Sequence, residues 1–190
     1  MKLTVKKSDA SEVEFELSDA SFSFANALRR TAMARVPVYA IDSVTFYENS
    51  SSLFDEYIAS RIGLVPLTTP SEAKEGDLVL FTLDAEGPCT VFSKDLKSSE
   101  KGVAPVSDRI PLLKLLAGQR LRLEARARLG SGSEHAKFQA GIAAYSFDRK
   151  KEAFHFRIES FGQVPAPKLV EKSVAMLLGK CEELLEALAE

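Results

Sequence analysis

The segment from residue 21 to residue 70 constrains the fold most strongly, because its hydrophobic period changes along its length. Over residues 22–35, the apolar side chains of Phe24, Leu28 and Ala32 recur at every fourth position, which predicts a helix with one buried stripe. Pro37 ends this helix. A strand is predicted after it at residues 38–47, and a second, short helix at residues 53–61.

Two arginines lie beside the buried stripe of this predicted helix. Arg29 and Arg30 fall off the stripe, close to the flexible thioether of Met33. Most surface charges are only solvated, so the pattern alone favours a solvated helix face. A surface that binds another protein is the alternative.

The rest of the chain predicts an α+β protein. Alternating apolar residues on both sides of the tetrad at 8–11 predict a β-hairpin with one face buried, and its lysine-rich and glutamate-rich strands are expected to pair by charge. Period two or β-rich composition predicts further strands at 78–83, 90–92, 121–129, 143–147 and 154–158. Residues 110–117 are ambiguous between helix and strand.

The last predicted helix follows the Pro-Ala-Pro sequence at 165–167. Its apolar residues recur at spacings of 4, 3, 4, 3 and 4, which is typical of a coiled-coil seam: Val170, Val174, Leu177, Cys181, Leu184 and Leu188. A helix lying on its own sheet would explain the seam equally well. Additional leucines widen the apolar surface, which favours cover by a partner, and Gly179 inside the helix suggests close packing there.

Composition excludes several classes of function. A net charge of −2 gives no basic excess for wrapping nucleic acid. Two cysteines without a Cys-x-x-Cys pair exclude a cysteine-built zinc or iron–sulfur site, and two histidines on different elements do not make a metal site. No stretch resembles a signal peptide or a membrane span. We therefore expect a cytoplasmic protein without metal or membrane contact.

The sequence also lacks a convincing catalytic constellation. The Gly-x-Gly at 130–132 is followed by neither the Lys-Ser/Thr of a P-loop nor a third glycine, so we expect no bound nucleotide or other cofactor. Asp55 and Glu56 are neighbours on a helix and point about 100° apart, and Cys181 is expected to be inert on a buried seam. A stand-alone enzyme or small-molecule-binding α/β protein nevertheless remains as one of two hypotheses, and the other follows from the motifs described next.

An ordered set of motifs carries a more specific signal. It consists of Asn26-Ala27-Leu28-Arg29-Arg30, Val36-Pro37, Ala40-Ile41, Val44, Asn49-Ser50-Ser51, Asp55-Glu56 and Arg61-Ile62-Gly63-Leu64-Val65-Pro66-Leu67. This set, which runs over almost fifty residues, resembles the signature of the RNA polymerase α-like assembly subunits: bacterial α, the archaeal D-type subunits and the eukaryotic third-largest subunits.

A second stretch, Gly130-Ser131-Gly132-Ser133-Glu134-His135-Ala136-Lys137-Phe138, resembles a loop of the archaeal and eukaryotic members. Phe138 and Ala140 depart from the tryptophan and proline usual there. We expect a form without the cysteine-rich insert of many archaeal relatives and without the C-terminal DNA-contacting domain of bacterial α. The chain is thus most similar to the archaeal D-type subunits, in a short form without iron–sulfur clusters.

The resemblance implies an architecture and a function. A dimerisation domain of antiparallel sheet plus helices would comprise residues 1–47 and 152–190, and a mainly-β domain, residues 48–151, would be inserted between them. The chain would be a non-catalytic assembly scaffold of DNA-directed RNA polymerase. It would pair with a smaller α-like subunit and then recruit the second-largest and other subunits for transcription, without sequence-specific contact to DNA.

The resemblance also assigns residues to two interfaces. The heterodimer interface would contain Phe24, Leu28, Met33, Val170, Val174, Leu177, Cys181, Leu184 and Leu188. The interface with the large subunits would contain Arg29, Arg30, Asp55, Glu56, Arg61, His135 and Lys137.

Overall fold

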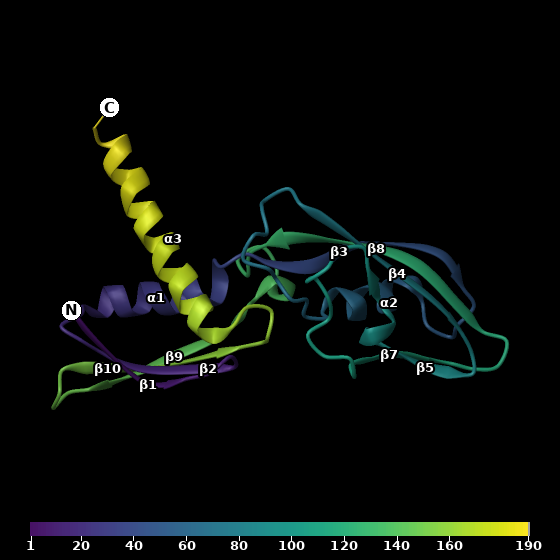
Figure 1. The fold of residues 1–190 in the computed structure, drawn as a ribbon, viewed down its shortest axis with the longest axis horizontal. Helices are drawn as coiled ribbons and strands as arrows, with labels where there is room; N and C mark the ends of the chain where they lie inside the picture. The colour runs from purple at the N-terminus through teal and green to yellow at the C-terminus, as the bar shows by residue number, and fades with distance from the viewer. Residues whose placement is uncertain (190) are drawn as a thin grey trace. The chain divides into compact units, whose positions relative to one another are not determined.

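The computed structural model describes residues 1–189, and the chain divides into two compact units. One unit combines residues 1–37 with the chain from residue 131 onward, and we call it the terminal unit. The other, residues 38–130, is the inserted unit. The fold is α+β, with a β-rich insert between the two ends of a sheet-and-helix unit, which confirms the predicted fold class (Figure 1).

The terminal unit is an antiparallel four-stranded sheet in the order β1-β2-β10-β9, with two helices over one of its faces (Figure 1). Its strands are β1 (Lys2–Ser8), β2 (Glu12–Ser18), β9 (Gly141–Asp148) and β10 (Ala153–Ser160). Its helices are α1 (Phe22–Ala34) and α3 (Ala166–Ala187), and a short 3-10 turn spans Ala136–Phe138. Aromatic rings join α1 to this sheet, because Phe22 lies 4.7 Å from Phe147 and 4.9 Å from Phe154, centroid to centroid.

The inserted unit contains a four-stranded sheet in the order β3-β8-β4-β6, a two-stranded sheet β5-β7, and one α-helix. Its elements are β3 (Val38–Asn49), α2 (Asp55–Gly63), β4 (Leu78–Glu86), β5 (Cys89–Phe92), a 3-10 turn (Ser93–Asp95), β6 (Lys97–Ser98), β7 (Pro111–Leu115) and β8 (Arg120–Gly130). Its core is filled by large apolar side chains, among them Ile41, Ile58, Ile62, Leu67, Phe81, Leu115, Leu121 and Leu123. The ambiguous stretch at 110–117 therefore contributes a strand.

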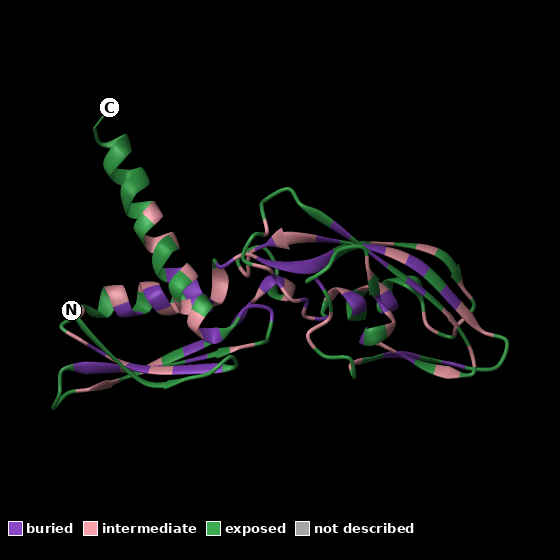
Figure 2. Ribbon diagram, in the orientation of Figure 1, coloured by how far each residue is buried: buried purple, intermediate pink, exposed green. Residues whose placement is uncertain are grey.

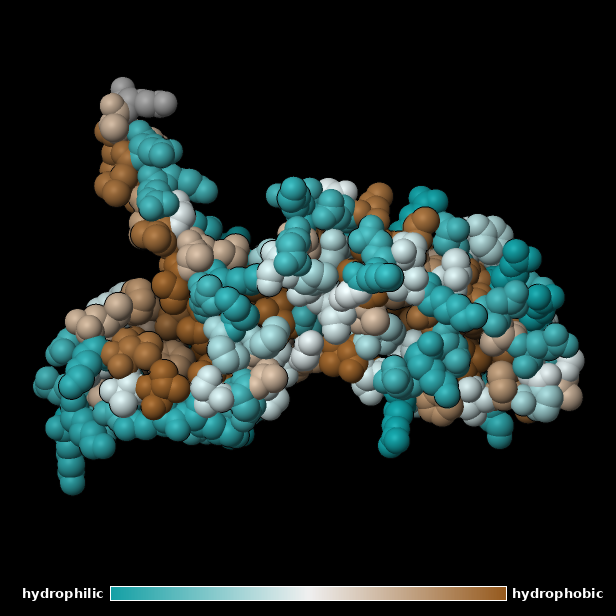
Figure 3. Space-filling view, viewed as in Figure 1, coloured by the Kyte–Doolittle hydropathy of each residue, from teal (hydrophilic) through white to brown (hydrophobic). Residues whose placement is uncertain are grey.

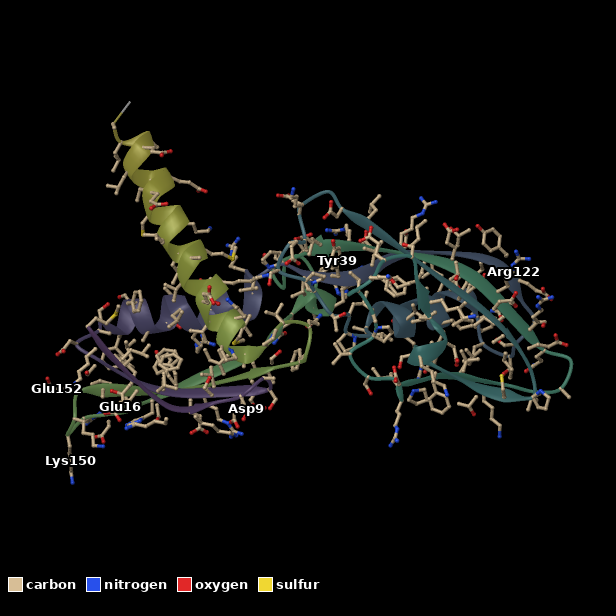
Figure 4. The ribbon with its side chains drawn as sticks, viewed as in Figure 1. Asp9, Glu16, Tyr39, Arg122, Lys150 and Glu152 are labelled. Carbon is tan, nitrogen blue, oxygen red and sulfur yellow. The ribbon has the colours of Figure 1, made fainter. Side chains whose placement is uncertain are left out.

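Strand β8 shows how sequence period sets the faces of the larger sheet. Leu121, Leu123, Ala125 and Ala127 at alternate positions are buried, whereas arginines and Glu124 take the intervening positions on the opposite face. The guanidinium of Arg122 lies 5.7 Å from the ring centroid of Tyr47, and Arg120 and Arg128 pair with Asp84 and Asp42 (Arg122 is labelled in Figure 4). Carboxylates of the same unit thus compensate the charges of Arg120 and Arg128, and an aromatic ring lies beside Arg122.

The unit boundaries differ from those expected at 47/48 and 151/152. In the structure the chain divides at 37/38 and 130/131. The reason is long-range pairing, since β3 pairs along its length with β8, and β9 pairs with β10 of the terminal sheet. Neither pairing is visible from local hydrophobic period.

The predicted hairpin is present as β1 and β2, and charge pairs cross it as expected. Lys6 Nζ lies 3.4 Å from Glu16 Oε2, and Lys7 pairs with the largely buried Glu12. The expectation that one face of both strands is buried was wrong for β1. Leu3 and Val5 remain exposed, because the helices of this chain pack on β2, β9 and β10.

The hairpin turn provides a pH-dependent contribution to stability. The Asp9 carboxylate accepts hydrogen bonds from the Ser11 hydroxyl (2.7 Å), the Ser11 N–H (2.9 Å) and the Glu12 N–H (2.8 Å), in the turn labelled in Figure 4. These bonds, with Lys7 nearby, lower the pKa of Asp9 from 3.8 to about 2. Because the native pKa lies below the unfolded one, this contribution is present above pH 3.8 and is lost as the pH falls towards 2.

We expect Asp9→Asn to flatten this pH dependence, since its amide oxygen still accepts hydrogen bonds but does not titrate. Urea unfolding followed by circular dichroism across that pH window measures the effect. Asp108→Asn is the control, because the exposed Asp108 carboxylate makes no hydrogen bond within residues 1–189. Equal pH slopes for the wild type and Asp9→Asn would contradict the role of this turn.

Candidate protein-interaction surface

Helix α1 is well defined at both ends. The Ser21 hydroxyl accepts a hydrogen bond from the N–H of Phe24 at 3.1 Å, which caps the helix N-terminus. At the other end, the N–H of Arg35 donates to the carbonyl of Thr31 at 3.0 Å. Leu28, expected at the heterodimer interface, is only 3% exposed and lies in the core of the chain itself. Phe24 and Met33 are half-buried and leave part of their surface accessible.

The two neighbouring arginines of α1 have different environments. The Arg29 guanidinium donates to Asn26 Oδ1 at 3.0 Å and contacts Met33 Sδ at 3.6 Å, so it lies along its own helix. Arg30 is exposed and makes no side-chain hydrogen bond or ion pair within the described residues. Arg30 is therefore the better candidate for a contact with another protein.

The C-terminal half of α3 has an apolar face that this chain does not cover. The buried residues of α3 end at Ser173, and beyond it the helix is mostly exposed (Figure 2). Figure 3 shows apolar side chains along one side of this part of the helix. At about 100° per residue these residues share one broad face, which we call the α3 face: Val174, Leu178, Cys181, Leu184, Leu185 and Leu188.

The α3 face differs from the predicted seam in three respects. Val170 and Leu177 are half-buried against their own unit, while Leu184 and Leu188 are 62% and 75% exposed. Cys181, expected to be buried, is exposed in this chain. A Cβ on Gly179 would meet no atom within 4 Å, so the close packing expected there does not come from this chain.

In the inserted unit, the predicted site residues at α2 are partly engaged in the fold. Asp55 Oδ1 accepts a hydrogen bond from Asn49 Nδ2 at 2.7 Å, and Arg61 Nη2 donates to the carbonyl of Pro111 at 2.7 Å. The same asparagine binds the hydroxyl of Ser51, so part of the Asn-Ser-Ser motif shapes the connection into α2. Glu56 lies exposed in the first helical turn, where the helix dipole favours a negative charge.

The sequence did not single out the apolar residues around α2. Phe54, Tyr57 and Leu64 are all exposed, and Phe54 is 81% exposed. A large aromatic residue at the N-cap position, where Ser, Thr, Asp or Asn is preferred, is the signal that could have identified this surface. Phe22 and the pair Leu178 and Leu185 likewise belong to the exposed apolar surface without having been assigned to an interface.

The glycine-containing loop after β8 fits closely against the end of α1. The Ser133 N–H donates to the carbonyl of Ala34 at 2.8 Å, and His135 Nδ1 accepts from the N–H of Lys137 at 3.1 Å. The ammonium group of Lys137 lies 5.1 Å from the centroid of the Phe138 ring, which is buried. His135 thus caps a short turn, and the loop does not resemble a phosphate cradle.

Gly132 is the point of closest approach in this loop. A Cβ there would lie 2.7 Å from the Met33 carbonyl oxygen and 3.1 Å from Ala34 Cα. We expect Gly132→Ala to lower the free energy of unfolding by about 1–3 kcal/mol, as overpacking does. Gly179→Ala is the control and should be neutral or stabilising by up to about 1 kcal/mol. Urea unfolding measures both, and equal effects of the two substitutions would contradict the close fit.

Within residues 1–189, no three His, Cys, Asp or Glu side chains lie close enough together to hold a metal ion. None of the helices in that range combines the length and the apolar composition that crossing a membrane requires. The features that stand out are instead the α3 face, Arg30 and the exposed apolar residues around α2. The fold defines a class of α+β chains in which a β-rich unit interrupts a sheet-and-helix unit, and the exposed surfaces indicate that such a chain binds other proteins.

Comparison with known proteins identifies the family. A model of the family described as the RNA polymerase Rpb3/RpoA insert domain matches residues 44–144. The chain is 41% identical over 189 residues to DNA-directed RNA polymerase subunit Rpo3 of Methanocaldococcus jannaschii, which covers 98% of this chain and 97% of that protein. It is 47% identical over 154 residues to Rpo3 of Pyrococcus furiosus, which covers 77% of this chain and 58% of the relative. The chain belongs to the family of α-like RNA polymerase subunits.

Proposed function

We propose that this chain is a non-catalytic assembly scaffold of a DNA-directed RNA polymerase. It pairs with a smaller α-like subunit, and the pair then provides the surface on which the large catalytic subunits dock. The scaffold itself binds no cofactor and makes no sequence-specific contact with DNA. Since transcription takes place where the DNA is, the proposal puts the chain in the cytoplasm of an archaeal cell.

The α3 face carries the proposal of pairing. The part of α3 beyond Ser173 packs little against its own unit, and a helical segment as short as this one is only marginally stable in water. Its exposed leucines also raise the free energy of the unpaired chain. Burying one leucine side chain contributes about 1.5–3 kcal/mol, so covering Leu184, Leu185 and Leu188 contributes a large share of the free energy that must offset the entropy lost on association. An apolar partner helix is the complementary surface.

Docking of the large subunits is assigned to a different set of residues. Arg30 is exposed, and its guanidinium makes no hydrogen bond within the described part of the chain. It is therefore available for charge-assisted, bidentate hydrogen bonds to another subunit. In the inserted unit, Glu56 and the apolar residues Phe54 and Tyr57 present a second exposed surface on α2. Arg29, Asp55, Arg61, His135 and Lys137 support these surfaces from within their own units.

Size-exclusion chromatography with light scattering tests the proposal. The chain is expressed alone and together with candidate α-like small subunits. We expect self-association or aggregation of the chain alone and a one-to-one complex with its partner. A monomer that binds none of the candidate subunits would contradict the proposal and favour a ligand-binding function.

A further inference from the structure

A cavity of about 300 Å³ lies in the terminal unit at the C-terminal half of α1. Its floor is formed by the small side chains of Ala27, Thr31 and Ala34, which share one side of the helix at spacings of four and three. Ser133 contributes one wall, which is held in place by its N–H bond to the Ala34 carbonyl. A backbone hydrogen bond therefore holds this wall against the end of α1.

Three cationic side chains line this cavity: Arg30 and Arg35 from α1, and Lys180 from α3. All three are exposed, and none forms an ion pair or a side-chain hydrogen bond within residues 1–189. Among residues 1–189, no acidic side chain lines the cavity. Three like charges around one small space repel each other, so an anionic occupant would lower the electrostatic free energy of the site.

The spacing of the two arginines indicates what kind of anion fits. Residues five positions apart on a helix lie about 140° apart around the axis and about 7.5 Å apart along it. Arg30 and Arg35 therefore approach the cavity from different directions, which favours an occupant with more than one anionic group over a single small anion. The alanine floor offers apolar contact to the backbone or methylene groups of an extended chain.

We propose that this cavity receives an acidic segment of the second-largest polymerase subunit. The segment places at least two carboxylates against Arg30, Arg35 and Lys180. This inference rests on the proposed scaffold function and names the chemistry of the partner at that site. Because Lys180 precedes Leu184 by one helical turn, the cavity borders the α3 face, and both surfaces are used in one assembly.

The first test measures capture of the second-largest subunit by the preformed heterodimer. The variant combines Arg35→Glu with Lys180→Glu, and its control combines Lys150→Glu with Lys172→Glu, which changes the net charge equally outside the cavity. We expect the variant to weaken capture at least about tenfold, with a shallower salt dependence, and the control to change it less than about twofold. A second variant with glutamine at positions 35 and 180 should fall in between.

Equal capture by variant and control would overturn the inference while leaving the scaffold function intact, because heterodimer formation is measured on the same samples. Failure of the wild-type chain to pair at all would instead contradict the scaffold function. These two failures are thus distinguishable.

A second test identifies the occupant. Carbodiimide treatment of the assembled complex activates carboxylates, which form an amide with an adjacent lysine amine as the carbodiimide leaves as a urea. We expect mass spectrometry to find Lys180 joined to an Asp or Glu of the second-largest subunit. Binding of inorganic phosphate to the heterodimer that is lost in the double variant, without such a cross-link, would overturn the acidic-segment proposal in favour of a small-anion site.

Discussion

Leu184→Asp combined with Leu188→Asp is expected to abolish pairing with the smaller α-like subunit. Both leucines lie on the α3 face and are largely exposed in the chain alone, so the substitutions remove little buried surface from the terminal unit. In a complex, each aspartate would place a charge where the partner offers apolar side chains. Loss of two buried leucines costs about 3 kcal/mol or more, which weakens binding by more than about 100-fold.

Light scattering and titration of the partner measure this loss, and circular dichroism checks that the helices and sheet remain. Glu183→Lys is the matched control, because position 183 lies on the opposite side of α3 from the α3 face. Leu177→Asp should also block pairing, but Leu177 is half-buried in its own unit, so its effect on folding is larger. Wild-type affinity of the Leu184/Leu188 variant would place the heterodimer interface elsewhere.

The local elements were predictable because each depends on periods and caps within a few residues. The helix expected at 22–35 is α1, and the hairpin and the late strand at 154–158 occur where alternation predicts them. The short strand β7 was ambiguous, because an apolar run of that length suits a helix as well as a strand. Tertiary pairing with β5 decides between them.

The limits of the two units were not predictable from the sequence pattern, for a different reason. Whether β3 belongs to the inserted unit depends on its pairing with β8, which follows it by many residues in the chain. Hydrophobic period reports which face of a strand is buried, but not which strand lies beside it. The exposure of Leu3 and Val5 on β1 follows similarly from where the helices pack.

For the candidate site, the sequence located the surfaces better than it ranked their residues. The pattern placed Arg29 and Arg30 together, but only the structure separates an arginine bound along its own helix from one that is accessible. The apolar seam was found from its spacing. How much of it the chain covers by itself depends on where α3 crosses α1 and the sheet, since the seam is half-buried at Val170 and exposed at Leu188.

Arg30→Ala is expected to leave the heterodimer intact and to weaken capture of the second-largest subunit. The Arg30 side chain makes no hydrogen bond or ion pair within the described chain that the substitution would break, so the terminal unit should keep its stability. A charge-assisted hydrogen bond contributes about 1.5–3 kcal/mol, which corresponds to about a 10- to 150-fold loss of affinity for the large subunit. Pull-down and titration with the purified heterodimer measure this change.

Two comparison variants separate recognition from general charge. Arg30→Lys keeps the charge but cannot make the bidentate contact of a guanidinium, so it should restore only part of the affinity. Arg29→Ala breaks contacts with Asn26 and Met33 within α1, so its main effect should be on the stability of the helix. Normal incorporation of Arg30→Ala into assembled polymerase would contradict the docking role. A larger loss of capture with Arg29→Ala, at unchanged stability, would transfer that role to the neighbouring arginine.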